Sequence, residues 1–256
     1  MHPMLQRLDE IAAQVAARDD TIALLGLGSA GAQRGRLDDH SDLDFFLVVA
    51  EGATTRYATE TDWLAATCPL VWSFAHERRG RKALFADGIF VEYGVFTVGE
   101  LRGVPFRGAR AVWRRADAPP GLTESDALVP RPPFDTVEFH LNEALAHLYV
   151  GLHRDLRGEH LSAARLIQGH AVDRVIALLR LSAGEPPYRD VFDDSRRVER
   201  TYPPHELPLA EMVPGYRGNA AAARVILDWL AARFRVPAPM GEAIERLLQM
   251  KIGRPA

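Results

Sequence analysis

The sequence has little cysteine and no long hydrophobic run, and each absence excludes a class of protein. Cys68 is the one cysteine in 256 residues, so the chain can form neither an intramolecular disulfide nor a zinc site of several cysteines. No apolar run approaches the roughly 20 residues that cross a bilayer. The N-terminal residues also lack the apolar core of a signal peptide. We therefore expect a cytoplasmic protein without membrane attachment.

Lysine is also scarce, and the net charge is small. Lys82 and Lys251 are the only lysines among 31 basic residues, and the formal net charge is −3. This charge gives no sign of a general polyanion-binding surface, so we expect no binding to extended nucleic acid, although a local basic pocket remains compatible with it. The hydrophobic fraction of 47% and charged fraction of 25% are typical of a globular protein with a sizeable core.

The first 117 residues predict a small mixed α/β domain. Apolar residues recur at helical spacing near the N-terminus, and several later runs have the β-branched and aromatic content of strands. Asp87 and Gly88 between two apolar runs indicate a hairpin turn. The expected elements are helices at 5–17 and 56–66 and strands at 22–27, 43–49, 70–74, 82–85 and 89–97.

Beyond this point proline and then helical periodicity dominate. The segments 118–121 (Ala-Pro-Pro-Gly) and 130–133 (Pro-Arg-Pro-Pro) disfavour regular structure, so we interpret 118–134 as a connection between domains. Asp135 and Glu138 have the spacing of a capping box at the start of a helix.

Residues 135–256 predict a helical bundle. The expected helices are one that starts at 135 and others at 161–181, 219–234 and 241–250, with the second ended by 184–187 (Gly-Glu-Pro-Pro). The predicted fold is therefore α/β (α+β), with a small mixed-sheet domain at 1–117 followed by a C-terminal helical domain at 135–256.

Two aspartates at the start of the second predicted strand are the most informative feature of the sequence. Residues two apart in a strand point to the same face, so Asp42 and Asp44 present their carboxylates side by side. Like charges this close repel each other, and a divalent cation such as Mg²⁺, which prefers carboxylate oxygens, removes the repulsion. The alternative is a solvated start of the strand.

A Gly-Ser pair after the first predicted strand completes the pattern. Gly28 lets the backbone turn closely, and Ser29 offers a hydroxyl and an amide to an anion. If a helix begins there, its N-terminal amides form a phosphate site. Arg34 and Arg36 could reach phosphate oxygens from the following loop. A phosphate site beside a magnesium-binding pair indicates phosphoryl or nucleotidyl transfer.

Gly28-Ser29, a spacer of twelve residues, and Ser41-Asp42-Leu43-Asp44 resemble the signature of the polymerase-β-like nucleotidyltransferase superfamily. The version with Ser41 is similar to its small-molecule branch, which includes antibiotic nucleotidyltransferases. The resemblance implies a nucleotidyltransferase domain that binds Mg²⁺ and a nucleoside triphosphate, with ATP as the expected donor.

The resemblance also implies a third carboxylate on a neighbouring strand. Glu92 is the acid in an otherwise apolar strand and is costly to bury without a partner. Asp87 is the rival, but its place before Gly88 suits a turn. A surface-facing Glu92 is the plain structural alternative. In the implied mechanism Asp42 and Asp44 bind the metal, while Glu92 binds a second metal or removes the proton of an acceptor hydroxyl.

In the C-terminal half, 196–199 (Arg-Arg-Val-Glu) resembles a stretch of lincosamide nucleotidyltransferase-like proteins. The resemblance implies that Arg196 or Arg197 contacts nucleotide phosphates and that the helical domain binds the acceptor, a small molecule with a hydroxyl group. A solvated loop is the alternative for both arginines. A lincosamide or aminoglycoside antibiotic is the expected acceptor, which implies a role in antibiotic resistance, and such enzymes often form homodimers.

Two other functions remain open from the sequence. The chain could nucleotidylate a protein side chain, or it could be a non-catalytic nucleotide-binding or antitoxin-like regulatory module. The presence of Asp42, Asp44 and Glu92 disfavours the second alternative.

Overall fold

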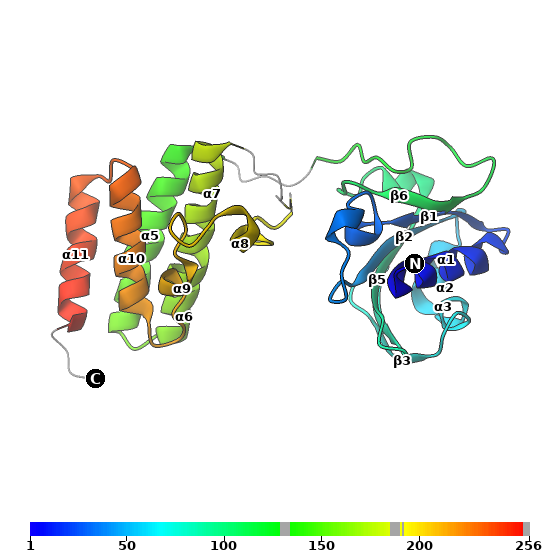
Figure 1. The fold of residues 1–256 in the computed structure, drawn as a ribbon, viewed down its shortest axis with the longest axis horizontal. Helices are drawn as coiled ribbons and strands as arrows, with labels where there is room; N and C mark the ends of the chain where they lie inside the picture. Colours follow the sequence, from blue (N-terminus) through cyan, green and yellow to red (C-terminus); the bar gives the residue numbers. More distant parts are fainter. Residues whose placement is uncertain (129–133, 185–189, 191, 253–256) are drawn as a thin grey trace. The chain divides into compact units, whose positions relative to one another are not determined.

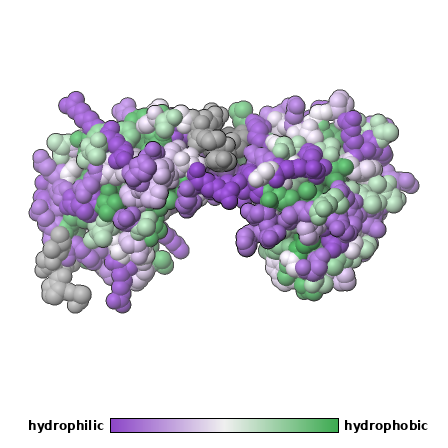
Figure 2. Space-filling model, viewed as in Figure 1, coloured by the Kyte–Doolittle hydropathy of each residue, from purple (hydrophilic) through white to green (hydrophobic). Residues whose placement is uncertain are grey.

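The computed structural model describes residues 1–128, 134–184, 190 and 192–252. The chain divides into two compact units, Met1–Val129 and Pro130–Ala256 (Figure 1). Each contains a hydrophobic core. Figure 2 shows mainly hydrophilic surface on both units, interrupted by hydrophobic patches. Two proline-containing segments that we interpreted as breaks, 130–133 and 185–187, lie outside the described residues. The domain boundaries at 117 and 135 remain predictions.

The described part of the N-terminal unit is built on a mixed sheet of six strands in the order β3-β4-β5-β2-β1-β6. Strands β2 and β5 are parallel and the other neighbours are antiparallel. The strands are β1 (Thr21–Gly26), β2 (Leu43–Val49), β3 (Leu70–Ala75), β4 (Gly80–Phe85), β5 (Phe90–Thr97) and β6 (Arg110–Arg114). The first five confirm the predicted strands, including the hairpin between β4 and β5.

Three helices cover one face of this sheet: α1 (Pro3–Ala16), α2 (Thr54–Thr59) and α3 (Asp62–Ala65) (Figure 1). Their apolar side chains pack on buried residues of the strands, such as Phe45 and Tyr93, whose rings stack at 5.2 Å. The predicted single helix at 56–66 is wrong, because Glu60 adopts an extended backbone between α2 and α3. The indole of Trp63 donates to the carbonyl of Glu60 at 3.0 Å and stabilises this break.

The opposite face of the sheet is covered over β1 and the C-terminal parts of β2 and β5. Phe46, Phe96 and Phe106 pack together there, with ring centroids 5.0 and 5.5 Å from Phe46. The short helix α4 (Val98–Leu101) supplies Leu101 to the same cluster. Nearer the start of β2, the same face carries charged and aromatic side chains, which form the candidate site described below.

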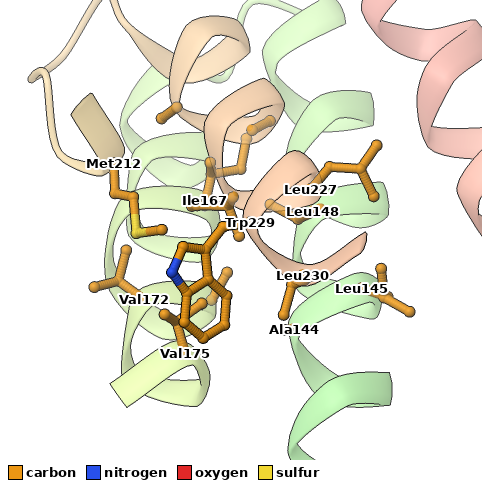
Figure 3. Close-up of a cluster of buried hydrophobic side chains, with 14 of the residues drawn as sticks. Ala144, Leu145, Leu148, Ile167, Val172, Val175, Met212, Leu227, Trp229 and Leu230 are labelled. Carbon is orange, nitrogen blue, oxygen red and sulfur yellow. The ribbon is translucent and has the colours of Figure 1, made fainter. Parts of the chain in front are cut away.

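The C-terminal unit is helical in its described residues. Its helices are α5 (Val137–Leu156), α6 (His160–Ala164), the π-helical segment η3 (Arg165–Ala171), α7 (Val172–Ala183), α8 (Val198–Thr201), α9 (Leu209–Met212), α10 (Asn219–Arg233) and α11 (Ala238–Ile252). The predicted helix at 161–181 is helical throughout, with η3 at its centre. Trp229 of α10 packs into the core beside Val172 and Val175 (Figure 3).

The start of α5 differs from the predicted capping box. Thr136, not Asp135, is the N-cap residue, and its hydroxyl accepts a hydrogen bond from the amide of Phe139 at 3.2 Å. The Asp135 carboxylate instead pairs with His140 at 2.9 Å and with Arg180. A longer-range charge interaction therefore takes the side chain away from the helix end.

The observed fold is α/β with a helical C-terminal part, as the sequence predicted. Within the described residues, no helix combines the length and hydrophobicity that a bilayer crossing requires.

Candidate active site

The three predicted carboxylates gather at one place on the open face of the sheet. Leu43 and Phe45 point into the core, so the alternating side chains of Asp42 and Asp44 belong to the opposite face. The parallel register of β2 and β5 sets Asp44 directly beside Glu92. All three acids are half-buried. Two segments separated by more than 40 residues thus bring their charges together.

The turn after β1 lies against these carboxylates. The amide of Leu27 donates to the carbonyl of Asp44 at 2.9 Å. Gly28 follows with φ of +51°, and a Cβ placed on it would lie 3.7 Å from Oδ2 of Asp44. This left-handed backbone is favoured by glycine. Ser29 is half-buried within a single 3₁₀ turn, η1 (Gly28–Ala30), so no longer helix begins at the Gly-Ser pair.

Glu92 has two partners that the sequence interpretation missed. Lys82 Nζ lies 2.9 Å from one carboxylate oxygen and His76 Nε2 lies 3.1 Å from the other. The hydrogen bond and charge of Glu92 raise the pKa of Lys82, and the charges of Asp44 and Asp42 add to this effect. The sequence offered one signal for the role of Lys82. Lysine is rare in this chain, and Lys82 is on the strand that pairs with β5 in the predicted hairpin.

A glycine makes room for His76 beside the carboxylates. A Cβ on Gly80 would come within 2.7 Å of the His76 ring, so a larger residue there would displace the imidazole from Glu92. The amide of His76 also donates to the carbonyl of Gly80 at 3.2 Å. The position of the imidazole therefore depends on this glycine.

The site suits a metal that arrives with a nucleotide. Within the described part of the chain, no group of three His, Cys, Asp or Glu side chains is arranged to hold a metal ion. Mg²⁺ commonly uses one or two carboxylates and completes its octahedron with water and substrate phosphates. Asp42 and Asp44 supply such a donor set beside the Gly28 turn, so the residues present fit a magnesium–nucleotide complex.

The predicted arginines lie in the loop after this turn, and a third arginine joins them. Arg34 is exposed, and Arg36 donates to the side chain of Gln33 within the 3₁₀ turn η2 (Arg34–Arg36). Arg110 of β6, which the sequence interpretation missed, donates from Nε and Nη2 to the carbonyl of Ala30 at 3.3 and 3.2 Å. Burial lowers the pKa of Arg110, and the positive charge of Arg34 lowers it further.

The other predicted nucleotide-binding residues lie in different surroundings. The Ser41 hydroxyl accepts a hydrogen bond from the amide of Asp38 at 3.0 Å and stabilises the turn before β2. Arg196 and Arg197 belong to the C-terminal unit. Arg196 pairs with the buried Asp190 at 3.2 Å, and Arg197 adopts a left-handed backbone at the start of α8. Their contacts with a nucleotide remain predictions.

Comparison with known proteins gives likeness in structure but not in sequence. No protein family model matches the chain, and no curated protein matches it. An aminoglycoside 6-adenyltransferase from Bacillus subtilis aligns over 99% of this chain and 100% of its own length, with 14% identity and a TM-score of 0.34.

Two further solved structures align at similar levels. A nucleotidyltransferase-like protein from Exiguobacterium sibiricum aligns over 97% of this chain and 76% of its own, with 13% identity and a TM-score of 0.33. A CD-NTase from Bradyrhizobium diazoefficiens in complex with GTP aligns over 98% of both chains, with 14% identity and a TM-score of 0.27. These TM-scores are below 0.5, so these similarities do not establish a function for this chain. The functional argument rests on the residues of the candidate site.

Proposed function

We propose that this protein is a nucleotidyltransferase, which transfers a nucleoside monophosphate from a nucleoside triphosphate, ATP in the first instance, to a hydroxyl group of a small molecule. The observation that carries the proposal is the alignment of Asp44 with Glu92 across two parallel strands, with the turn at Leu27 and Gly28 hydrogen-bonded to the backbone of Asp44 through the Leu27 amide. The carboxylates lie beside a turn that a phosphate group can approach closely. This arrangement of carboxylates and turn in one unit supports the proposal.

The donor would bind at the β1–β2 side of the site. Asp42 and Asp44 would hold Mg²⁺ together with the phosphates, and the metal would neutralise charge on them and activate the α-phosphorus. The backbone amides of Gly28 and Ser29 would donate hydrogen bonds to the phosphates. Arg34, which is exposed in the adjacent loop, can reach the terminal phosphates as a charged hydrogen-bond donor.

Glu92 would take the proton from the acceptor. The acceptor oxygen forms a bond to the α-phosphorus, the bond to the bridging oxygen breaks, and pyrophosphate leaves with the electron pair. The acceptor proton passes to a carboxylate oxygen of Glu92. Lys82 and His76 each contact one oxygen of this carboxylate and so restrain its orientation.

The expected acceptors are hydroxylated antibiotics of the lincosamide or aminoglycoside kind, which would make the protein a cytoplasmic resistance enzyme. The test is a pyrophosphate-release screen of four nucleoside triphosphates with Mg²⁺ against a panel of hydroxylated antibiotics. We expect one nucleotide and one acceptor class to respond. If no acceptor responds while labelled ATP marks a protein of a lysate, the substrate is a protein side chain.

Substitution of a carboxylate separates catalysis from mere nucleotide binding. Asp42→Asn should lower metal-dependent turnover about 100-fold or more, because a catalytic metal supplies several kcal/mol. Asp39→Asn is the matched control, since Asp39 is 95% exposed in the same loop. Nucleotide and metal binding that is unchanged by Asp42→Asn, without turnover of any acceptor, would contradict the proposal.

A separate substitution tests the proposed acid–base role of Glu92. Glu92→Gln keeps the size of the side chain but cannot accept the proton, so turnover should fall about 100-fold or more. Nucleotide affinity, measured by calorimetry, should stay near that of the unsubstituted protein. A variant that loses nucleotide binding and turnover together would show that Glu92 acts in binding instead.

A further inference from the structure

The face of the sheet that carries the carboxylates continues into a row of aromatic side chains. Strand β4 lies between β5 and the edge strand β3. Lys82 is in register with Glu92 on one side and with Phe74 on the other. The carboxylate site and the aromatic side chains of β3 are thus separated by a single residue across the sheet.

Three rings form this aromatic platform: Trp72, Phe74 and Phe90. The ring centroid of Trp72 lies 4.9 Å from that of Phe74 and 6.3 Å from that of Phe90, with the planes of Trp72 and Phe90 inclined by 29°. Trp72 is 47% exposed and Phe74 is 43% exposed. Figure 2 shows hydrophobic surface at the end of the N-terminal unit where Figure 1 labels β3. Aromatic rings exposed together mark a binding surface more often than isolated apolar residues do.

The order of the strands indicates which substrate meets the platform. The turn at Gly28, where the proposed pyrophosphate group would lie, is on the β1 side of Asp44. Phe90 is on β5, the strand that also carries Glu92, and Trp72 and Phe74 are on β3, further from β1. In phosphoryl-type transfer the attacking and leaving oxygens are roughly in line. An acceptor opposite the pyrophosphate would therefore lie over β5, β4 and β3.

The charges beside the platform limit the kind of acceptor. Lys82, which lies between Phe74 and Glu92 in the strand register, and His76 both contact Glu92, and the ring of Phe74 is 6.3 Å from that of His76. A polycationic acceptor would bring positive charge against the Lys82 ammonium, while the exposed rings would find no apolar surface to cover them. A neutral molecule with a flat ring and a hydroxyl group avoids repulsion from Lys82 and covers the exposed aromatic rings.

We propose that Trp72, Phe74 and Phe90 bind the acceptor, and that the acceptor is an uncharged hydroxyl compound with an aromatic or flat apolar ring. This inference rests on the proposed nucleotidyl transfer and narrows its substrate class. Among the acceptors named above, it favours compounds with an apolar face over polycationic aminoglycosides.

The experiment uses the full chain with ATP, Mg²⁺ and three acceptor probes. 4-Nitrophenyl β-glucoside and methyl β-glucoside present the same sugar hydroxyls with and without an aromatic ring, and kanamycin presents hydroxyls on a polycation. Pyrophosphate release gives KM and kcat for each probe, and saturation-transfer NMR gives its binding. The nitrophenyl glucoside should have the lowest KM of the three.

Two substitutions test the rings directly. Trp72→Ala and Phe74→Ala should each raise the KM for the nitrophenyl glucoside about 5-fold to 10-fold, with the KM for ATP unchanged. Val71→Ala is the matched control, because Val71 is 63% exposed on the same strand and is not part of the ring cluster. Circular dichroism and sedimentation accompany each variant.

The outcomes separate this inference from the proposed function. Pyrophosphate release that is insensitive to Trp72→Ala and Phe74→Ala, or that prefers kanamycin, overturns the platform and leaves nucleotidyl transfer standing. Variants that change only the sedimentation coefficient show the rings to be an interface between copies and overturn it also. No binding of ATP and no turnover with any probe would remove both proposals.

Discussion

At the scale of single residues, the candidate site combines three acids with one ammonium group. Lys82 forms an ion pair with Glu92, and the negative charges of Asp42 and Asp44 also raise its pKa. Without a metal, this ammonium partly neutralises carboxylates that would otherwise repel each other. The same charge would oppose a divalent cation at the proposed metal site, so we expect Lys82 to lower the metal affinity of that site.

Removal of the Lys82 charge should therefore strengthen metal binding. With Lys82→Met, we expect the affinity for Mn²⁺ to rise about tenfold, which corresponds to the repulsion between one and two charges about 6 Å apart in water. Electron paramagnetic resonance of free Mn²⁺ measures this affinity. Lys82→Arg keeps the charge and should bind Mn²⁺ as the unsubstituted protein does, and a weaker affinity in Lys82→Met would contradict the role of Lys82.

At the scale of elements, the edge strand β6 supports the turn that would hold the phosphates. Gly26, at the end of β1, is in register with Arg110. The Arg110 guanidinium donates twice to the carbonyl of Ala30, which ends the η1 turn. Arg110 of β6 thus holds in place the η1 turn, which follows the neighbouring strand β1.

Loss of this support should weaken nucleotide binding without changing the chemical step. We expect Arg110→Met to raise the KM for the nucleotide about tenfold, because hydrogen bonds from charged groups contribute about 1.5–3 kcal/mol, while kcat stays within about twofold. Arg114→Met is the matched control, since Arg114 is exposed on the same strand. Steady-state kinetics with varied nucleotide makes the measurement, and an equal fall in kcat for both variants would count against a positioning role.

At the scale of the whole molecule, each unit has its own hydrophobic core. The C-terminal unit contains a buried carboxylate, Asp155 of α5, that joins three other helices. It pairs with His160 at 2.7 Å, Asn219 at 2.9 Å and Lys251 at 2.9 Å. Burial raises the pKa of Asp155, but the hydrogen bonds from Asn219, His160 and Lys251 outweigh it, so the net pKa is lowered.

This lowered pKa predicts an acid-sensitive C-terminal unit. A carboxylate with a lowered pKa stabilises the folded state fully above its ordinary value of about 4, and this contribution is lost as the pH falls below that value. Asp155→Asn should cost about 3 kcal/mol at pH 7, and the difference from the unsubstituted protein should shrink between pH 5 and pH 3. Hydrogen exchange of α5 peptides in urea measures it.

Asp228→Asn is the control for this measurement, because Asp228 is 64% exposed in its pair with Arg224. Exposed pairs contribute at most about 1 kcal/mol, so this variant should behave like the unsubstituted protein at every pH. A free-energy difference for Asp155→Asn that stays constant with pH would refute the assigned charge network.

The sequence alone determined the strands and long helices, because their apolar residues repeat at periods that follow from backbone geometry. It failed for β6, where arginines flank Ala111, Val112 and Trp113, since an edge strand that is partly solvated needs no continuous apolar run. It also failed at 56–66, because the indole of Trp63 accommodates a break through hydrogen bonds that no local pattern encodes.

For the candidate site, the sequence determined the local pairs: Asp42 with Asp44 through strand alternation, and Gly28 with Ser29 through adjacency. The family resemblance pointed to Glu92 on a neighbouring strand, and the fold supplied its register beside Asp44. The fold also placed Lys82, His76 and the rings of β3 on the same face. Those neighbours depend on strand order and register, which arise from packing between segments distant in the chain. The sequence pattern identifies acidic residues that are costly to bury alone, and the pairing of the strands determines which side chains lie beside them.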